Sequence, residues 1–214
     1  MLLFIMKSYI YNLSTIDYNT CTVFQKRLNN LRNDGEISDS FIFPEHDDVY
    51  TAGIHYKGDL NNIIKTERGG YVTYHGRGQL IAYYIVNLKD RKMNALDLIK
   101  LIQSSVIELL KTYNIDGYPL YDEKTGVWHG DKKIASIGIA VNRFSTYHGM
   151  ALNISTDLKK FNFINPCNFS PDIMTSMEKI KGQKYDLNEV KKRFIEITLK
   201  KFDITDYVIK NNII

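Results

Sequence analysis

The stretch GVWHGDKKIASIGIAVNRFSTYHGMALNI, residues 126–154, carries the clearest indication of the fold. Runs rich in β-forming residues occupy 126–128, 134–141 and 147–154, and residues 129–132 between the first two are typical of a hairpin turn. Successive strands without an intervening helix break the strand–helix–strand repeat of a doubly wound sheet. The stretch therefore favours a mixed sheet.

Towards the N-terminus, four apolar residues share one face of a predicted helix. Cys21, Phe24, Leu28 and Leu31 lie three, four and three positions apart, so the helix should end near the turn at 33–35 and bury Cys21. Further β-rich runs follow this helix, at residues 41–43, 49–54, 71–74 and 80–88.

The most regular helical pattern begins at Asn94, whose side chain can cap a helix together with Asp97 three residues later. Apolar residues then recur at helical spacing as far as Tyr113. This mixture of helices with hairpin-linked strands predicts an α+β (mixed α/β) fold, a mixed β-sheet with packed helices. No linker or repeat divides the chain, so we expect one domain over residues 1–214.

Two further helices are predicted near the C-terminus. Ser170 as N-cap and Pro171 as the first helical residue should open a helix through residues 173–180. Asp186, with Glu189 in the capping-box position, should open the last helix, whose Lys- and Arg-rich face we expect in solvent.

Composition excludes several classes of protein. Among 214 residues, 28 Lys and Arg against 24 Asp and Glu give a net charge of +4, and the 15 tyrosines are not interleaved with a basic stripe, so nucleic-acid binding is not expected. The apolar opening of residues 1–6 is too short for a membrane anchor and lacks signal-peptide features, and translation could begin at Met6. Two cysteines allow at most one disulfide, which favours a cytoplasmic location.

The sequence RGGYVTYHGRGQ, residues 68–79, holds the densest cluster of residues suited to ligand binding. Its four glycines allow backbone N–H groups to approach a ligand closely, and Arg68 or His75 could hold or polarise a carbonyl or phosphate group. A glycine-rich hairpin without a ligand explains the composition equally well. The spacing matches neither a P-loop nor a dinucleotide fingerprint.

This cluster resembles the signature of the lipoyl(octanoyl) transferases of lipoate biosynthesis, which runs Arg-Gly-Gly, two variable residues, Thr, an aromatic, His, two variable residues, Gly, Gln and then a Tyr, here Tyr83. The likeness covers the chain from about Tyr9 to Cys167. Other blocks follow in the family's order, at Asp17-Tyr18 with Gln25, 46–53, 126–128, 133–138, 147–153 and 165–167.

The resemblance implies the fold of the biotin/lipoate protein ligase catalytic domain and an acyltransferase without cofactor or metal. Cys167 would take an octanoyl (or lipoyl) group from acyl carrier protein as a thioester, with Lys133 as acid/base partner. The acceptor would be a lysine on lipoyl domains of 2-oxoacid dehydrogenases or on glycine cleavage H protein. The implied substrate-binding residues are Arg68, Gly69, Gly70, Tyr71, Val72, Thr73, Tyr74, His75, Ser136, Ile137, Gly138, Gly149, Met150 and Ala151.

Two alternatives stay open, an ATP-dependent lipoate ligase of the same superfamily and a carrier-protein-binding module without catalysis. Without the resemblance, Cys167 would be interpreted as a buried apolar residue and Lys133 as a solvated one. His75 and His148 lack metal-ligand spacing and are expected to form hydrogen bonds in the acyl site. Two departures flank the predicted site: Arg77 stands where the family usually has proline, and Asn168 where glycine commonly follows the cysteine.

Overall fold

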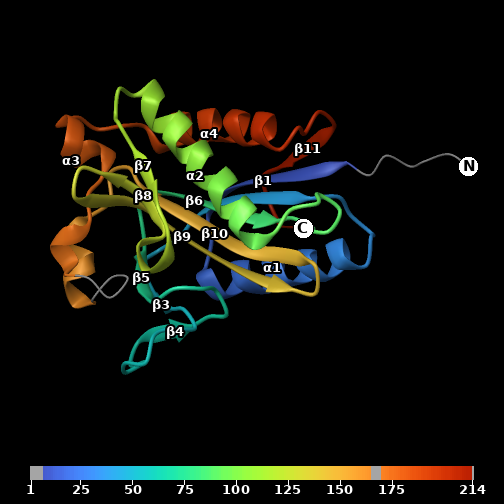
Figure 1. The fold of residues 1–214 in the computed structure, drawn as a ribbon, viewed down its shortest axis with the longest axis horizontal. Coiled ribbons are helices and arrows are strands. Elements are labelled where there is room, and N and C mark those ends of the chain that lie inside the picture. Colours follow the sequence, from blue (N-terminus) through green and yellow to red (C-terminus); the bar gives the residue numbers. More distant parts are fainter. Residues whose placement is uncertain (1–6, 165–169, 214) are drawn as a thin grey trace, which may run out of the picture.

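The computed structural model describes residues 7–164 and 170–213, and its main feature is an eight-stranded mixed sheet (Figure 1). Strands β1, β2 and β11 run parallel to one another, and the remaining neighbours are antiparallel. In sheet order the strands are β11 (Tyr207–Lys210), β1 (Ser8–Thr15), β2 (Ser40–Glu45), β6 (Gln79–Ile85), β10 (Ser145–Asn153), β9 (Lys132–Asn142), β8 (Gly126–His129) and β7 (Tyr118–Leu120).

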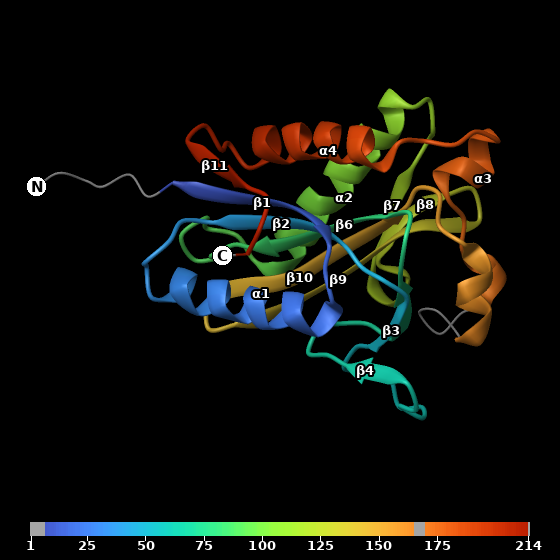
Figure 2. The ribbon, with the colours of Figure 1, turned by 180° about the vertical axis from the view of Figure 1, so that it is seen from behind.

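A second, three-stranded sheet supports the candidate site. Its order is β4 (Ile63–Lys65), β3 (Val49–Ala52) and β5 (Val72–His75). Both figures place it at one end of the large sheet, away from β1 and β11 (Figures 1 and 2). The β8–β9 hairpin and the β9–β10 pair confirm the strands predicted between residues 126 and 154.

Helices cover both faces of the large sheet (Figures 1 and 2). The helix α1 (Tyr18–Asn33) lies on one face, and α2 (Ala95–Thr112) and α4 (Leu187–Lys201) lie on the other. Each face buries its own apolar cluster. The described residues also contain the short α3 (Met177–Lys181) and the 3-10 turns η1 (Asp122–Lys124), η2 (Leu158–Phe163) and η4 (Pro171–Ile173).

The predicted helix around Cys21 and the helix that begins after Asn94 are both confirmed. The N–H of Thr20 donates to the Asp17 carboxylate over 2.8 Å at the start of α1, and Cys21 is fully buried. At the start of α2, Asn94 and Asp97 exchange hydrogen bonds of 3.0 and 2.9 Å, which is the predicted capping box.

The continuous helix predicted from Ser170 is wrong. The 3-10 turn η4 is followed by extended backbone at Met174, and α3 begins only after Ser176, whose hydroxyl accepts from the N–H of Lys179. Met174 is buried and forms a β-bridge with Lys133, and this tertiary pairing overrides the helical spacing. Cys167, three residues before Ser170, lies outside the described residues.

The last helix is confirmed, with one difference. Asp186 caps it by accepting from the N–H of Asn188 over 2.8 Å. On the face predicted to be solvated, Lys191 is instead buried, and its ammonium donates to the Leu13 carbonyl over 2.8 Å and to the Phe43 carbonyl. Burial lowers the pKa of Lys191. The two carbonyls explain why a lysine is tolerated here, because each accepts a hydrogen bond that water would otherwise accept from the ammonium.

Candidate active site

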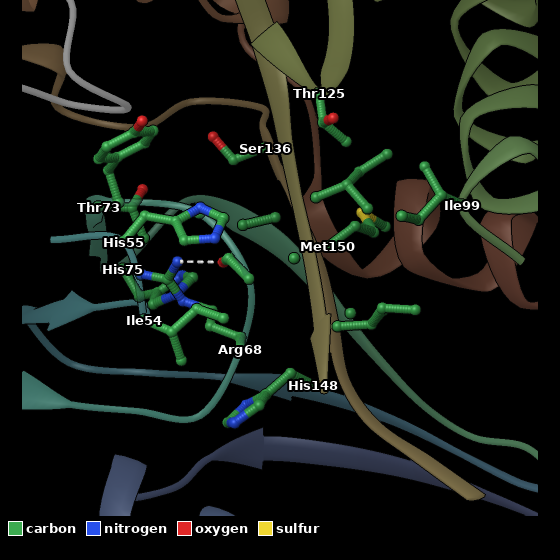
Figure 3. A pocket seen from close by; sticks show the side chains of 18 of the residues that line it. Ile54, His55, Arg68, Thr73, His75, Ile99, Thr125, Ser136, His148 and Met150 are labelled. Atoms are coloured by element: carbon green, nitrogen blue, oxygen red, sulfur yellow. Dashed lines mark hydrogen bonds between the residues drawn. The ribbon is translucent and has the colours of Figure 1, made fainter. Parts of the chain in front are cut away.

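A cavity of about 640 Å³ opens between the small sheet, η1 and the strands β9 and β10 (Figure 3). Lys133 and twelve of the fourteen predicted substrate-binding residues line it. Those twelve residues are Arg68, Gly69, Gly70, Tyr71, Thr73, His75, Ser136, Ile137, Gly138, Gly149, Met150 and Ala151.

Val72 and Tyr74 are buried in the wall behind the cavity and do not line it. They alternate with Thr73 along β5, so their side chains leave the strand on its other face. The ring of Tyr74 packs against Phe161, and its hydroxyl donates to Asp48 over 2.6 Å. Cys167 lies outside the described residues, and its role remains a prediction.

The loop at residues 68–71 is hydrogen-bonded to both sheets. The Gly69 N–H donates to the Ile139 carbonyl of the large sheet over 3.0 Å. Carbonyls of the loop accept from the segment after β3, in the pairs Gly53 N–H to Tyr71, Ile54 N–H to Arg68 and His55 N–H to Gly70. A Cβ on Gly138 would lie 2.9 Å from the Gly69 carbonyl, so glycine on β9 permits this close approach.

Replacement of Gly70 by valine should abolish acyl-enzyme formation while leaving the protein folded. Gly70 has a φ of 89°, a conformation that a β-branched residue adopts only with strain, and the loop must shift to relieve it. Intact-protein mass spectrometry reports acylation, and circular dichroism reports the fold. Gly35→Val is the matched control, because Gly35 has a φ of 75° in a remote turn with no atom within 4 Å of its Cβ position. A folded Gly70→Val protein with normal acylation would contradict a role for this loop.

Arg68 lies buried at the cavity wall. One terminal nitrogen donates to both the carbonyl and the hydroxyl of Thr51, each over 2.9 Å, and the other donates to the Gly69 carbonyl over 3.1 Å. These bonds fix a permanent positive charge beside the cavity, since a guanidinium does not lose its proton in proteins. Such a charge can stabilise a carbonyl or an oxyanion of a bound substrate.

Three buried histidines surround the inner part of this wall. His46 donates through Nδ1 to the Ile16 carbonyl over 2.7 Å, so its neutral form accepts at Nε2 from the Tyr83 hydroxyl over 2.9 Å. The ring of His75 stacks on Tyr18 at 5.9 Å between centroids. Burial lowers the pKa of His46 and lowers that of His75 well below its ordinary value.

His148 departs from regular strand geometry in β10. Its φ is 61°, and its ring contacts Tyr147 and Tyr83 on the α1 side of the sheet, although Met150, two residues on, joins the α2-side core. Neither ring nitrogen has a hydrogen-bond partner among the described residues. Burial, with a contribution from Arg68, lowers the pKa of His148 to about 3. His148 is therefore a neutral group in the cavity wall.

Acid should destabilise the fold through these three histidines. Their pKa values are lower in the folded protein than the value of about 6.5 in an unfolded chain, so below that pH the unfolded chain binds protons that the folded chain does not. This contribution to stability is therefore fully present above pH 6.5 and is lost as the pH drops, by up to about 1.4 kcal/mol per pH unit for each histidine whose folded-state pKa lies below that pH. Chemical denaturation between pH 7 and 4.5 measures this slope.

The variant His148→Asn tests the contribution of one imidazole to that slope. Asparagine tolerates the left-handed backbone and does not titrate, so the slope should decrease by about one proton. His55→Asn is the control, because it removes an exposed imidazole from the same cavity. An unchanged slope in His148→Asn would contradict the assignment.

Lys133 and Lys132 occupy contrasting environments although they are adjacent on β9. Lys133 is 1% exposed, and its ammonium lies 5.8 Å from the centre of the Trp128 ring. A Cβ on Gly126 would lie 2.6 Å from Lys133 Cε, so a glycine makes room for this side chain. Lys132 is on the surface, 3.4 Å from the carboxylate of Asp172. The structure thus places Lys133, and not Lys132, at the cavity.

Several lining residues escaped prediction because they come from separate parts of the chain. Tyr18, Tyr83 and His148 were noted in motifs, but nothing in the local pattern indicated the others. These are Ile54, His55 and Lys57 after β3, Ile99 on α2, Asp122, Glu123 and Thr125 near η1, and Ile139 on β9.

The described residues contain no group of three or more histidine, cysteine or acidic side chains placed to hold a metal ion. Within the same ranges, no helix is long and apolar enough to cross a membrane.

Comparisons with known proteins extend these observations. The family model of the lipoyl protein ligase A/B catalytic domain matches residues 17–198. The protein named "Probable octanoyltransferase 2" from Picrophilus torridus is 58% identical over 97% of this chain and 84% of its own. An octanoyltransferase from Desulforamulus reducens is 34% identical over 95% of each chain. A crystal structure of lipoate-protein ligase A bound with ATP matches with a TM-score of 0.75 at 19% identity, over 97% of this chain and 90% of that one. This likeness confirms the predicted fold.

Proposed function

The chain belongs to the lipoyl protein ligase A/B catalytic domain family, and we propose that it is an octanoyltransferase of protein lipoylation that works through a thioester on Cys167. Relatives at 58% and 34% identity are named octanoyltransferases. We further propose that residues 1–214 act as one catalytic domain in the cytoplasm. The observation that carries the mechanism is the burial of Lys133 at a cavity lined by the predicted substrate-binding residues.

In the first half-reaction, the Cys167 thiolate attacks the carbonyl carbon of an octanoyl thioester on acyl carrier protein. A new C–S bond forms, the bond to the phosphopantetheine sulfur breaks, and the Lys133 ammonium supplies the proton that the leaving thiolate takes up. The buried guanidinium of Arg68 supports this step, because negative charge develops on the carbonyl oxygen.

In the second half-reaction, the amine of an acceptor lysine attacks the acyl-enzyme. An amide bond forms, the C–S bond to Cys167 breaks, and the neutral Lys133 amine removes the proton of the attacking nitrogen. The proposed acceptors are lysines of lipoyl domains, including those of 2-oxoacid dehydrogenases and the glycine cleavage H protein. One lysine therefore returns to its starting protonation state after each turnover.

The experiment that tests this function compares two acyl sources. Octanoyl-acyl carrier protein alone should produce an acyl-enzyme and then an octanoylated lipoyl domain, both visible as mass increments in intact-protein spectra. Free octanoate with ATP should produce neither. Modification of the lipoyl domain only with octanoate and ATP would instead establish a ligase, and no modification with either source would indicate a binding module.

Replacement of Arg77 by proline should leave the salt dependence of kcat/KM for octanoyl-acyl carrier protein unchanged. The guanidinium of Arg77 lies 2.9 Å from Asp47 and 3.5 Å from Glu45, so two carboxylates already compensate its charge. The ion pair between Arg77 and Asp47 is exposed, and its electrostatic field is screened within about 8 Å at physiological ionic strength. Steady-state kinetics over a salt series measures both slopes. A shallower slope in Arg77→Pro would show that Arg77 steers an acidic carrier protein to the site.

A further inference from the structure

The lining of the cavity differs in chemistry between the two faces of β9. Figure 3 shows Arg68, Thr73 and His75 on one side of the long strand that crosses the view, and Ile99 and Met150 on the other. The first side also carries Tyr18, Tyr83 and His148, which lie around α1. On the second side, Ile99, Ile137, Ile139 and Met150 form an apolar surface continuous with the core beneath α2.

The two sides meet at an open edge of β9. The strand β8 pairs with β9 from Lys132 as far as Ser136, and the Gly69 N–H bonds to the carbonyl of Ile139. Between these points no described strand pairs with the edge at Ile137 and Gly138. Because the cavity is lined from both faces of β9, it passes around the strand here.

Alternation along β9 aligns the side chains with the two surfaces. Ser136 and Gly138 face the loop that carries Arg68, and Ile137, between them, faces the α2-side core, where its register partner on β10 is Met150. A substrate that enters beside Lys133 therefore meets polar groups on one side and the apolar surface of Ile99, Ile137, Ile139 and Met150 on the other. An acyl thioester matches this arrangement, because it has a polar carbonyl group at one end and a hydrocarbon tail at the other.

We propose that Ile99 is a specificity-determining residue that closes the apolar side of the cavity and sets the length of acyl chain the enzyme accepts. This inference rests on the proposed function, because it requires an acyl donor. Ile99 reaches the cavity from the second turn of α2, whereas Ile137 and Met150 come from the sheet, so its side chain forms the wall opposite the strands. It is partly exposed although it packs against the α2-side core, as expected for a residue at a cavity surface.

A change in volume at Ile99 should shift selectivity without abolishing the reaction. The proposed chemistry takes place at Cys167 and Lys133, and Ile99 would contact only the hydrocarbon tail. One methylene in an apolar pocket changes kcat/KM by about 10- to 200-fold. In Ile99→Ala, the ratio of kcat/KM for decanoyl- over octanoyl-acyl carrier protein should therefore rise at least ~10-fold. In Ile99→Phe, the corresponding ratio for hexanoyl over octanoyl should rise instead.

The test measures kcat/KM for hexanoyl-, octanoyl-, decanoyl- and dodecanoyl-acyl carrier protein in wild type and in both variants. Ile107→Ala is the matched control, because Ile107 lies on the same helix, packs against the same core and does not line the cavity. Opposite shifts in Ile99→Ala and Ile99→Phe, with none in Ile107→Ala, would support the inference. Unchanged ratios in folded Ile99 variants, or an equal shift in Ile107→Ala, would overturn it while leaving the proposed function intact. Failure of wild type to accept any of the four donors would overturn both.

Discussion

Incubation with octanoyl-acyl carrier protein should acylate Cys167 and leave Cys21 unmodified. The chain has two cysteines, and the structure excludes one of them as a nucleophile. Cys21 is fully buried on α1, and burial raises the pKa of its thiol to about 12, so the reactive thiolate does not form near neutral pH. A single hydroxylamine-labile adduct is therefore expected, and Cys167→Ala should reduce acyl transfer to background.

Cys21→Ala is the matched control for this prediction. It removes a buried thiol that accepts a long contact of 4.0 Å from Gln25, so it should affect stability more than acylation. Peptide mapping of the adduct identifies the modified residue in wild type. An adduct that persists in Cys167→Ala and disappears in Cys21→Ala would overturn the assignment of the nucleophile.

Lys133→Arg should reduce turnover by roughly 10²- to 10⁴-fold, the loss typical of a general acid/base. Arginine keeps the positive charge but cannot exchange protons near neutral pH. It is also larger, and the Lys133 side chain is confined between Gly126 and the Trp128 ring. The measurement is the rate of octanoyl transfer to a lipoyl domain under saturating donor.

Lys132→Arg separates a specific role of Lys133 from a general effect on this strand. Lys132 is on the surface beside Asp131 and Asp172, and arginine can replace it in either ion pair. We therefore expect near-normal turnover in Lys132→Arg. A large loss in Lys132→Arg together with normal activity in Lys133→Arg would show that the acid/base lysine is misassigned.

The sequence patterns predicted correctly those helices and turns that are determined by residues close together in the chain. The capping box of α2, the helical face of α1 and the hairpin between β8 and β9 each depend on residues close together in the chain, and all three are present. The strands β1 and β11 were missed because their pairing joins residues almost 200 positions apart, as between Tyr9 and Val208. Parallel pairing of this kind leaves no turn signal nearby.

In the candidate site too, the features set by neighbouring residues could be predicted and those set by distant residues could not. The glycine-rich loop could be found because its backbone requirements act through residues 68–71 themselves, as the positive φ of Gly70 shows. A contiguous motif also included Val72 and Tyr74, which strand alternation turns away from the cavity. Ile99 could not be found, because α2 comes to this cavity only through packing of the whole sheet.

The hydrogen bond from Gly69 to Ile139 has a consequence for motion. The loop at residues 68–71 is hydrogen-bonded to the segment after β3, and this bond links its backbone to the large sheet. Local opening of the small sheet would break the link and dismantle one wall of the cavity in the same event. A ligand that binds only the assembled cavity must then suppress that opening in proportion to its affinity. Donor binding and local opening of the small sheet are thus linked equilibria, and the rate of amide exchange at Gly69 would report on both.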